Sequence, residues 1–383
     1  MKSEWQSRTV SDLEAARILL VQDGKHGEYR PRRDEIVSDG TPHIRAADIS
    51  DAGAVDFDGA QRINDIAFSR INKGVGAGGD VLLTHKGTVG RIGRAPSDAP
   101  RFLCSPQTTF WRSLDTQQLD QNFLFAYLRS PAFSLQLRAR MHESDMAPYV
   151  SLTAQRSFSV LLPPIVEQRR IAYVASALDD KLDSNDRVSR LLEDAAATLF
   201  WARFVDFVGV EEFEESEIGR IPSDWVVERI GEVLDTVGGG TPSTKEPAYW
   251  DGGTHCWATP KDLSGHTSPV LLDTSRHVTD PGAARISSGL LPPGTVLLSS
   301  RAPIGYTAMT KVPVAINQGF IASRPSDRLP NEYVLFWMRQ NLETIKNHAG
   351  GTTFAEISKR AFRPRVSGFS VVWVESSVEL IAA

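Results

Sequence analysis

Two stretches of the chain share one pattern: Gly79-Asp-Val-Leu-Leu-Thr-His-Lys-Gly-Thr-Val-Gly90 and Gly294-Thr-Val-Leu-Leu-Ser-Ser-Arg-Ala-Pro-Ile-Gly305. In each, glycine precedes a short Val/Leu run, Asp80 to Thr84 or Thr295 to Ser299, which is typical of a buried strand. The second stretch follows the first by 215 residues, from Gly79 to Gly294. The pattern predicts the same strand in two copies of one unit.

Two further pairs of segments keep the same order and nearly the same spacing. Upstream, Pro42-His-Ile-Arg-Ala-Ala-Asp-Ile-Ser50 corresponds to Cys256-Trp-Ala-Thr-Pro-Lys-Asp-Leu-Ser264. Downstream, Phe123-Leu-Phe-Ala-Tyr-Leu-Arg129 corresponds to Tyr333-Val-Leu-Phe-Trp-Met-Arg339. Apolar residues at helical spacing predict helices over Phe123 to Leu137 and Tyr333 to Lys346. We therefore predict a tandem duplication of an α+β unit, each copy one domain of roughly 150 to 180 residues.

Between the copies, no Gly or Pro interrupts the chain from Ile165 to about Phe204. A helix of this length would be about 60 Å long. It can be an ordinary buried helix, but its length and its charged faces favour a coiled-coil spacer, in which Asn185 would fix the register. The domain limits that follow are 1–164, 165–207 for the helix, and 208–383. The residues on the a and d positions of the heptad are Ile171, Val174, Leu178, Asn185, Val188, Leu192, Ala195 and Leu199, with the charged Lys181 as an exception.

Composition restricts the class of protein. The 383 residues carry 42 Lys+Arg against 47 Asp+Glu, a net charge of -5, with 41% hydrophobic and 23% charged residues. These values indicate a globular protein without a uniformly basic surface. No apolar run is long enough to span a membrane, and no signal peptide follows Met1, so we expect a cytoplasmic protein. Cys104 and Cys256 have no partner spacing for a zinc site, and we expect both to be reduced and no metal to be bound.

The usual motifs of catalysis are absent from the sequence. Gly74-Val-Gly-Ala-Gly-Gly79 spells a dinucleotide fingerprint, but it precedes a strand instead of following one. The sequence has no Walker A motif, nucleophile elbow or His-Glu-x-x-His motif, nor the Asn/Asp-Pro-Pro-aromatic signature of DNA amino-methyltransferases. We expect a protein that is not an enzyme and that carries no cofactor of its own.

Several short motifs, taken in order, resemble the specificity subunit of Type I restriction-modification systems, and together they extend over nearly the whole chain. They are Leu162-Pro-Pro-Ile165, Glu167-Gln-Arg-Arg-Ile171, Ile221-Pro-Ser-Asp-Trp225, Gly238-Gly-Gly-Thr-Pro-Ser243, Trp257-Ala-Thr-Pro-Lys-Asp262, Gly294-Thr-Val-Leu-Leu-Ser299 and Gly350-Gly-Thr-Thr-Phe354. The resemblance implies two target recognition domains, each reading one half of a bipartite double-stranded DNA sequence. It also implies that the central helix sets the spacer between the half-sites and docks DNA adenine methyltransferase subunits.

The same resemblance implies further partners. The methyltransferases would use S-adenosylmethionine, and nuclease subunits, where present, would use ATP and Mg²⁺. In the family, a second conserved helix after the second recognition domain packs antiparallel on the central helix. Here the sequence stops at Ile381-Ala-Ala383, after a strand-like segment, Ser370 to Val374, without a counterpart of 165–204. A truncation would explain this, but we favour a second chain that supplies the helix, because an unpaired heptad seam exposes apolar surface.

Candidate DNA contacts lie in loops that flank the repeated strands, where cationic, amide and hydroxyl side chains can bind phosphates and base edges. In the first copy they are Arg45, His85, Lys86, Arg91, Arg94, Gln107 and Arg112; in the second they are Thr244, Lys245, Lys261, Arg301, Asn317, Gln318 and Arg324. Lys86 and Arg301 nearly match, as do Gln107 and Gln318, whose amides suit bidentate adenine contacts. The candidates for partner binding are Ile171, Val174, Leu178, Asn185, Val188, Leu192 and Leu199, with Arg169, Arg170 and Arg187 at the rim.

Two other functions compete with DNA recognition. A scaffold of duplicated protein-binding modules would agree with the acidic net charge, and an enzyme with an unfamiliar nuclease or methyltransferase motif would show activity as a purified chain. A salt-sensitive gel shift on duplex DNA separates the scaffold from a DNA reader, because binding to phosphates weakens steeply with salt.

Overall fold

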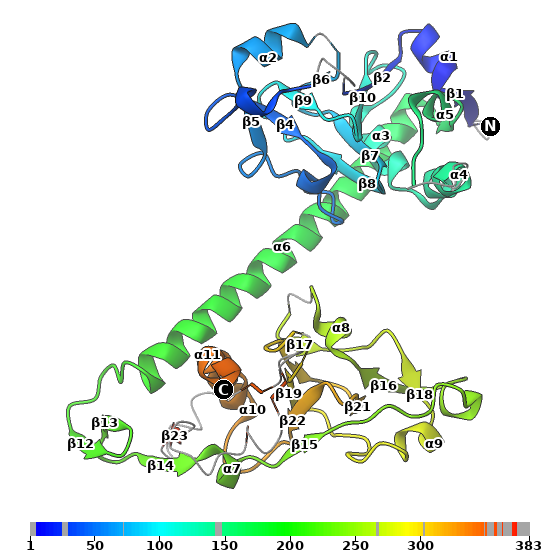
Figure 1. Cartoon of the computed structure of the whole chain (residues 1–383). Coiled ribbons are helices and arrows are strands. Elements are labelled where there is room, and N and C mark those ends of the chain that lie inside the picture. Colours follow the sequence, from blue (N-terminus) through cyan, green and yellow to red (C-terminus); the bar gives the residue numbers. More distant parts are fainter. Residues whose placement is uncertain are drawn as a thin grey trace. The chain divides into compact units, whose positions relative to one another are not determined.

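The computed structural model describes residues 5–24, 30–71, 73–141, 148–265, 268–301, 303–347, 349–350, 356–357, 362 and 370–373 (Figure 1). The chain divides into two compact units, an N-terminal unit of residues 1–184 and a C-terminal unit of residues 185–383. This division falls within the long helix, whereas the predicted domain limits set that helix apart.

The N-terminal unit mixes short strands and short helices. Its elements are β1 (Gln6–Thr9), α1 (Val10–Ala15), β2 (Leu19–Asp23), η2 (Arg33–Glu35), β3 (Ile36–Val37), β4 (Thr41–Ile44), η3 (Ala46–Asp48), β5 (Gln61–Ile63), α2 (Asp65–Arg70), β6 (Val75–Gly76), β7 (Val81–Lys86), β8 (Thr88–Arg94), β9 (Phe102–Cys104), β10 (Thr108–Ser113), α3 (Gln121–Leu128), α4 (Pro131–Met141), α5 (Leu152–Arg156), β11 (Ser159–Leu162) and the first half of α6 (Ile165–Phe204).

Two sheets form the body of this unit. The antiparallel sheet has the order β2-β10-β7-β8, and the second sheet has the order β3-β5-β4-β9-β6, in which β4 and β9 are parallel. Strand β7 is buried on both faces: Leu83 contacts the core cluster under α3 and α4, and Leu82 contacts the cluster under β4 and β9. The burial of both faces explains why the strand reads as continuous Val/Leu without alternation.

The C-terminal unit contains the second half of α6 and a similar series of elements. They are β12 (Phe213–Ser216), β13 (Gly219–Pro222), β14 (Val226–Arg229), α7 (Ile230–Val233), β15 (Thr236–Gly238), η4 (Pro247–Tyr249), β16 (His255–Ala258), α8 (Pro260–Leu263), β17 (Val270–Leu271), β18 (His277–Val278), α9 (Asp280–Ala283), β19 (Val296–Ser299), β20 (Thr307–Thr310), β21 (Val314–Ile316), β22 (Phe320–Ser323), α10 (Asn331–Gln340), α11 (Leu342–Asn347) and β23 (Ser370–Trp373).

Strand pairing repeats from one unit to the other. The order β15-β22-β19-β20 reproduces β2-β10-β7-β8, and β18-β16-β21 reproduces β5-β4-β9, including the parallel pair. An antiparallel pair of distant strands also recurs, β1 with β11 and β14 with β23. The predicted duplication and the α+β class are thus confirmed, and the repeated motif near Gly294 does form the buried strand β19.

The predicted helices after the repeated strands need a correction. Each is two helices, α3 and α4 in the N-terminal unit and α10 and α11 in the C-terminal unit. The first break precedes Pro131, the opening residue of α4, because proline lacks the amide that would continue a helix. The second break is at Asn341, whose side-chain Nδ2 donates to Trp337 O at 2.9 Å.

The predicted long helix is confirmed with the expected bounds: α6 has 40 residues and follows Pro163-Pro164. At its start, buried Gln168 accepts the Asp120 amide at 2.9 Å and donates to Gln118 O at 3.0 Å, which joins the helix to the N-terminal unit. At its end, Phe204 lies 4.9 Å from Tyr333 between ring centroids, within the core of the C-terminal unit. Every residue from 180 to 192 is exposed.

Among the described residues, no helix combines the length and the apolar composition needed to cross a membrane.

One half-buried histidine, whose Nε2 atom is buried, makes the stability of the N-terminal unit depend on pH. The Nε2 atom of His43, on β4, is buried without a hydrogen-bond partner among the described residues. Burial, helped by the positive charge of Arg45 and opposed by Asp48, lowers the pKa of His43 to about 4. The pKa of an unfolded histidine is about 6.5, so the unfolded chain binds more protons than the folded chain between these values.

We predict that the N-terminal unit keeps its full stability with respect to His43 above pH 6.5 and loses stability as the pH falls toward 4, because protonation of His43 favours the unfolded chain. Between pH 7 and pH 5 the loss is about 2 kcal/mol, and His43→Leu should remove it. Hydrogen-exchange mass spectrometry of peptides from the N-terminal unit measures the effect, with His255→Gln in the other unit as the control. Equal pH dependence in wild type and His43→Leu would contradict the assignment.

Candidate nucleic-acid interface

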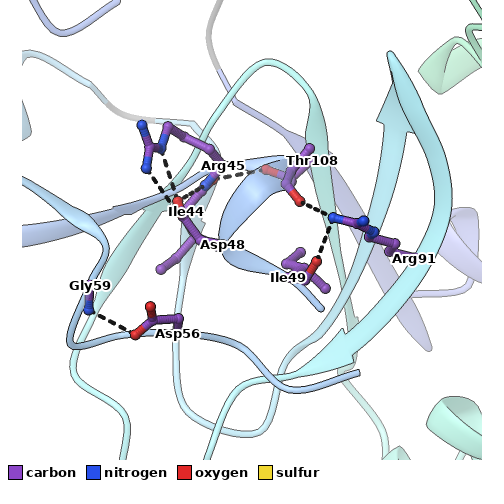
Figure 2. A network of polar contacts seen from close by, with 9 residues as sticks. Ile44, Arg45, Asp48, Ile49, Asp56, Gly59, Arg91 and Thr108 are labelled. Atoms are coloured by element: carbon purple, nitrogen blue, oxygen red, sulfur yellow. Dashed lines mark hydrogen bonds and ion pairs between the residues drawn. The ribbon is translucent and has the colours of Figure 1, made fainter. Parts of the chain in front are cut away.

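In the N-terminal unit, four loops meet at one end of the antiparallel sheet. We call this the Gln107 edge, formed by residues 23–24, 44–48, 85–86 and 105–107. Backbone hydrogen bonds join the loops: the His85 amide donates to Gln107 O at 2.9 Å, and the Ser105 amide donates to Ile44 O at 2.9 Å. The Thr108 hydroxyl also donates to Ile44 O, at 3.2 Å (Figure 2). The backbone segments that carry these side chains therefore lie close together.

The C-terminal unit builds the same arrangement, here called the Gln318 edge, from residues 239–241, 258–262, 300–301 and 317–319. The Ser300 amide donates to Gly319 O at 2.8 Å, and the Asn317 amide donates to Ala258 O at 3.0 Å. A side-chain contact is added, because the Thr241 hydroxyl donates to Gln318 Oε1 at 2.6 Å. The two edges thus share their backbone geometry.

Equivalent glycines permit the close approach of these loops. A Cβ atom on Gly24 would lie 2.0 Å from Cys104 O, and one on Gly239 would lie 1.9 Å from Ile316 O. Such distances are far below van der Waals contact, so only glycine allows the loop after the first sheet strand to cross the end of the neighbouring sheet.

Equivalent aspartates position the loop after the parallel strand. Asp48 Oδ2 accepts the Arg45 amide at 2.8 Å, and its carboxylate also binds the Arg45 guanidinium (Figure 2). Asp262 Oδ2 accepts the Thr259 amide at 2.8 Å and the Thr259 hydroxyl at 2.7 Å. Burial raises the pKa of Asp262, but hydrogen bonds from Ser275 and Thr259 outweigh it, and the pKa lies below its ordinary value. Both carboxylates accept backbone amides and so shape the loops.

Seven of the predicted DNA contacts lie at the two edges. Lys86, Gln107, Lys261 and Gln318 are exposed, and Arg45, Arg301 and Asn317 are half-buried. Thr244 and Lys245 are also exposed, in the loop that continues from Thr241. Whether any of them binds DNA stays a prediction.

Other predicted contacts lie away from the edges and have partners in the fold. Arg94 donates to Asn122 Oδ1 at 2.7 Å, and Arg324 donates to Asp235 Oδ2 at 2.9 Å. Arg112 binds both carboxylate oxygens of buried Asp80, at 2.7 and 2.6 Å. All three lie at strand ends opposite to the Gln107 or Gln318 edge.

Two predicted residues support the fold next to the Gln107 edge. Arg91 binds Asp51 Oδ1 at 2.6 Å and donates to Ile49 O at 3.1 Å, so it joins β8 to the loop after η3 (Figure 2). The prediction for His85 is wrong, since its side chain is fully buried and its Nδ1 lies 3.0 Å from Val150 O. An imidazole inside the core cannot contact DNA.

Parts of the chain are similar in sequence to known proteins. The family model described as "Type I restriction modification DNA specificity domain" matches residues 222–364. A Type I restriction enzyme MjaIX specificity subunit from Methanocaldococcus jannaschii is 42% identical over 155 residues, 40% of this chain and 36% of that protein. A putative MjaX specificity subunit from the same organism is 22% identical over 93% of this chain and 81% of its own length. These matches make parts of this chain similar to specificity subunits of Type I restriction enzymes.

A solved structure has a similar fold. The Type I restriction-modification system S subunit from M. genitalium has a TM-score of 0.54 at 14% identity, covering 100% of this chain and 90% of that one. The match to the MjaIX subunit spans 36% of the length of that protein.

The predicted partner-binding residues of α6 are mostly exposed. Ile171 is half-buried and Asn185 is exposed. The exposed fractions of the other five are 58% for Val174, 62% for Leu178, 51% for Val188, 66% for Leu192 and 70% for Leu199. Leu182 and Leu191 are also exposed but lie outside the predicted heptad register. A straight helix has 3.6 residues per turn, so a 3.5-residue repeat gradually rotates around it. The apolar stripe therefore shifts around the helix and comes to include residues outside the predicted register.

Sequence reasoning missed three residues of this region. Lys73 binds Asp23 Oδ1 at 2.8 Å at the Gln107 edge, and Thr241 orients Gln318. Arg276 stacks 3.7 Å from the ring centroid of Trp250. Thr241 lies in the glycine-rich motif already noted, but nothing in the local sequence marks Lys73 or Arg276. Most of the Gly350–Phe354 motif lies outside the described residues.

Adjacent glycines provide a direct test of the close approach. Gly239→Ala should destabilise the C-terminal unit by about 1 to 3 kcal/mol through overpacking against Ile316 O. Gly240→Ala is the matched control, because a Cβ there meets nothing within 4 Å. Hydrogen exchange of C-terminal-unit peptides measures the difference, and equal destabilisation by both substitutions would show that the loop is not tightly packed.

Proposed function

We propose that this chain is a non-catalytic DNA-recognition subunit of a Type I restriction-modification complex, in which each unit reads one half of a bipartite double-stranded target. The observation that carries the proposal is the repeated edge, where the same backbone bonds bring together segments that carry a cation and an exposed glutamine in both units. A DNA-reading role also places the chain in the cytoplasm, where a microbial chromosome lies.

The neighbouring residues at each edge suit the two tasks of a DNA reader. The His85 amide bonds to Gln107 O and the Ser300 amide bonds to Gly319 O, so the segments that carry Lys86 and Arg301 lie beside the turns that carry Gln107 and Gln318. Gln107 and Gly319 are equivalent in the strand register, and Gln318 precedes that position by one residue. Cations bind phosphates and position the protein, whereas an amide can donate and accept at once and so read adenine. Gln318 Oε1 has two lone pairs, so it can keep the Thr241 bond and still accept from a base.

The acidic net charge of -5 does not conflict with this proposal. Lys86 is exposed at the Gln107 edge and Lys261 at the Gln318 edge, and a local field attracts DNA irrespective of the total charge. Partner subunits would supply the remaining phosphate contacts.

Substitution of the two glutamines tests the proposal. In cells that carry the complete system, Gln107→Ala should alter or relax one base of one half-site, and Gln318→Ala should do so only in the other half-site. Loss of a bidentate contact is worth about 1 to 3 kcal/mol of discrimination. Methylome sequencing measures the motif, and exposed Gln117→Ala, at the opposite end of β10, is the control. An unchanged motif in both glutamine variants would reject these residues as readers.

We propose further that the exposed apolar stripe of α6 docks DNA adenine methyltransferase subunits and forms the spacer between the half-sites. Those partners would bring S-adenosylmethionine, and restriction subunits would bring ATP and Mg²⁺. The support is that Val174, Leu178 and Leu192 are each more than half exposed, and burying such side chains against a partner stabilises a complex by about 1.5 to 3 kcal/mol each.

Charges on this stripe should prevent assembly. The double variant Val174→Asp/Leu178→Asp should lose co-purification with the methyltransferase, since each carboxylate would be buried without a partner. Arg190→Asp, an exposed position on the opposite face of the helix, should assemble normally. Circular dichroism checks that the variants remain folded, and normal assembly of the double variant would refute the docking site.

A further inference from the structure

Three side chains with metal-binding atoms converge in the C-terminal unit. Cys256 Sγ lies 3.5 Å from Asp273 Oδ1 and 3.9 Å from His277 Nε2, and His277 Nε2 lies 2.8 Å from Asp273 Oδ1. All three ligand atoms are therefore within 4.8 Å of one another. Their present hydrogen bonds show that the side chains already point toward one common place.

Backbone geometry fixes two of the three side chains. Cys256 on β16 pairs directly with His277 on β18 in the antiparallel register, so both side chains extend from the same face of the sheet. Directly opposed residues have Cβ atoms about 5 Å apart, which suits two ligands of one ion.

The third side chain, Asp273, lies four residues before His277. Asp273 Oδ1 accepts the Thr274 amide at 2.8 Å. Thr274 is buried, and its hydroxyl accepts the Trp257 amide at 3.0 Å and donates to Arg276 O at 2.7 Å. The segment that carries the carboxylate and the imidazole is thus tied to the neighbouring strand.

We infer that Cys256, Asp273 and His277 form a binding site for one zinc ion, with a fourth position open to water. Thiolate and imidazole ligands select zinc over calcium or magnesium, and zinc takes four ligands in a tetrahedron. With zinc-to-ligand bonds of 2.0 to 2.3 Å, the ligand atoms of such a site are about 3.4 to 3.6 Å apart. The two sulfur distances are close to this range.

The third distance requires a small adjustment. The carboxylate and the imidazole must separate by about half an ångström from hydrogen-bond length. The side chain of Asp273 is 73% exposed and that of His277 is 33% exposed, so both can move while buried Cys256 stays in place. The same exposure gives an ion access from solvent.

Proton chemistry agrees with a zinc site that depends on pH. Burial, and then the bond to Asp273, raises the pKa of the Cys256 thiol, which is therefore protonated when no ion is bound. The Thr274 amide and His277 lower the pKa of Asp273, so the carboxylate is ionised. Zinc must displace the thiol proton when it binds.

The site belongs to the C-terminal unit only. In the equivalent register of the N-terminal unit, Pro42 on β4 pairs with Arg62 on β5, and neither can ligate a metal in these positions. The other cysteine, Cys104, is buried on β9 and lies at a different place in the fold.

An ion at this site would fix a segment next to the Gln318 edge. Arg276, between Asp273 and His277, stacks on Trp250, and Trp257, next to Cys256, donates its indole proton to Gly240 O at 3.2 Å. Zinc would therefore rigidify the strand pair that supports the glycine-rich loop. This role is structural and is independent of whether the edge binds DNA.

Cobalt substitution tests the inference on the purified full-length chain. One equivalent of Co²⁺ should produce the near-ultraviolet thiolate-to-cobalt absorption band, and one equivalent of Zn²⁺ should abolish it. Cys256→Ser should eliminate the band, and His277→Gln should weaken cobalt affinity at least about tenfold. Cys104→Ala, the matched control, should retain the band, with circular dichroism confirming that each variant is folded.

Three results would overturn the site: no band in the wild-type chain, a band that persists in Cys256→Ser, or a band that disappears in folded Cys104→Ala. Because the readout is metal absorption, it is independent of DNA binding. Failure here would leave the proposed DNA-recognition role intact.

Discussion

The structure of each unit depends on one strand that is buried on both faces. Val81 and Leu83 of β7 contact one core cluster while Leu82 contacts another, and β19 repeats this with Val296, Leu298 and Leu297. Removing the apolar surface of such a strand from water supplies a large part of the stability of each unit, at roughly 25 cal/mol for each Å² buried. Both layers of the unit pack on this strand, so its position determines where its ends lie.

The end of that strand leads directly to the candidate interface. In each unit a backbone amide at the end of the buried strand, from His85 or Ser300, bonds to the turn that precedes the neighbouring strand. This bond brings the segment that carries Lys86 or Arg301 close to the turn that carries Gln107 or Gln318. The glycine and aspartate positions that shape the other loops are also repeated, at Gly24 and Gly239 and at Asp48 and Asp262. Duplication has thus preserved the backbone framework of the edge, while the exposed side chains around it differ between the units.

Sequence alone predicted the features that depend on regular spacing. The repeat, the two buried strands and the bounds of α6 follow from apolar runs and from the positions of Gly and Pro. The His85 prediction failed because β7 continues to Lys86 with an irregular register between Leu83 and His85, which turns the imidazole into the core under Val150. The bidentate pair of Arg112 with Asp80 and the convergence of Cys256 with His277 depend on strand pairing between distant residues. Local sequence patterns do not encode such pairing, so these contacts required the structure.

The central claim is that two copies of one module read the two halves of one DNA sequence. Methylome sequencing of the source cell, with and without the gene for this chain, tests it most directly. The account predicts that deletion removes adenine methylation from a single motif with two specified halves and an unspecified spacer, and that the intact gene restores it. An identical set of methylated motifs in both cells would contradict the claim.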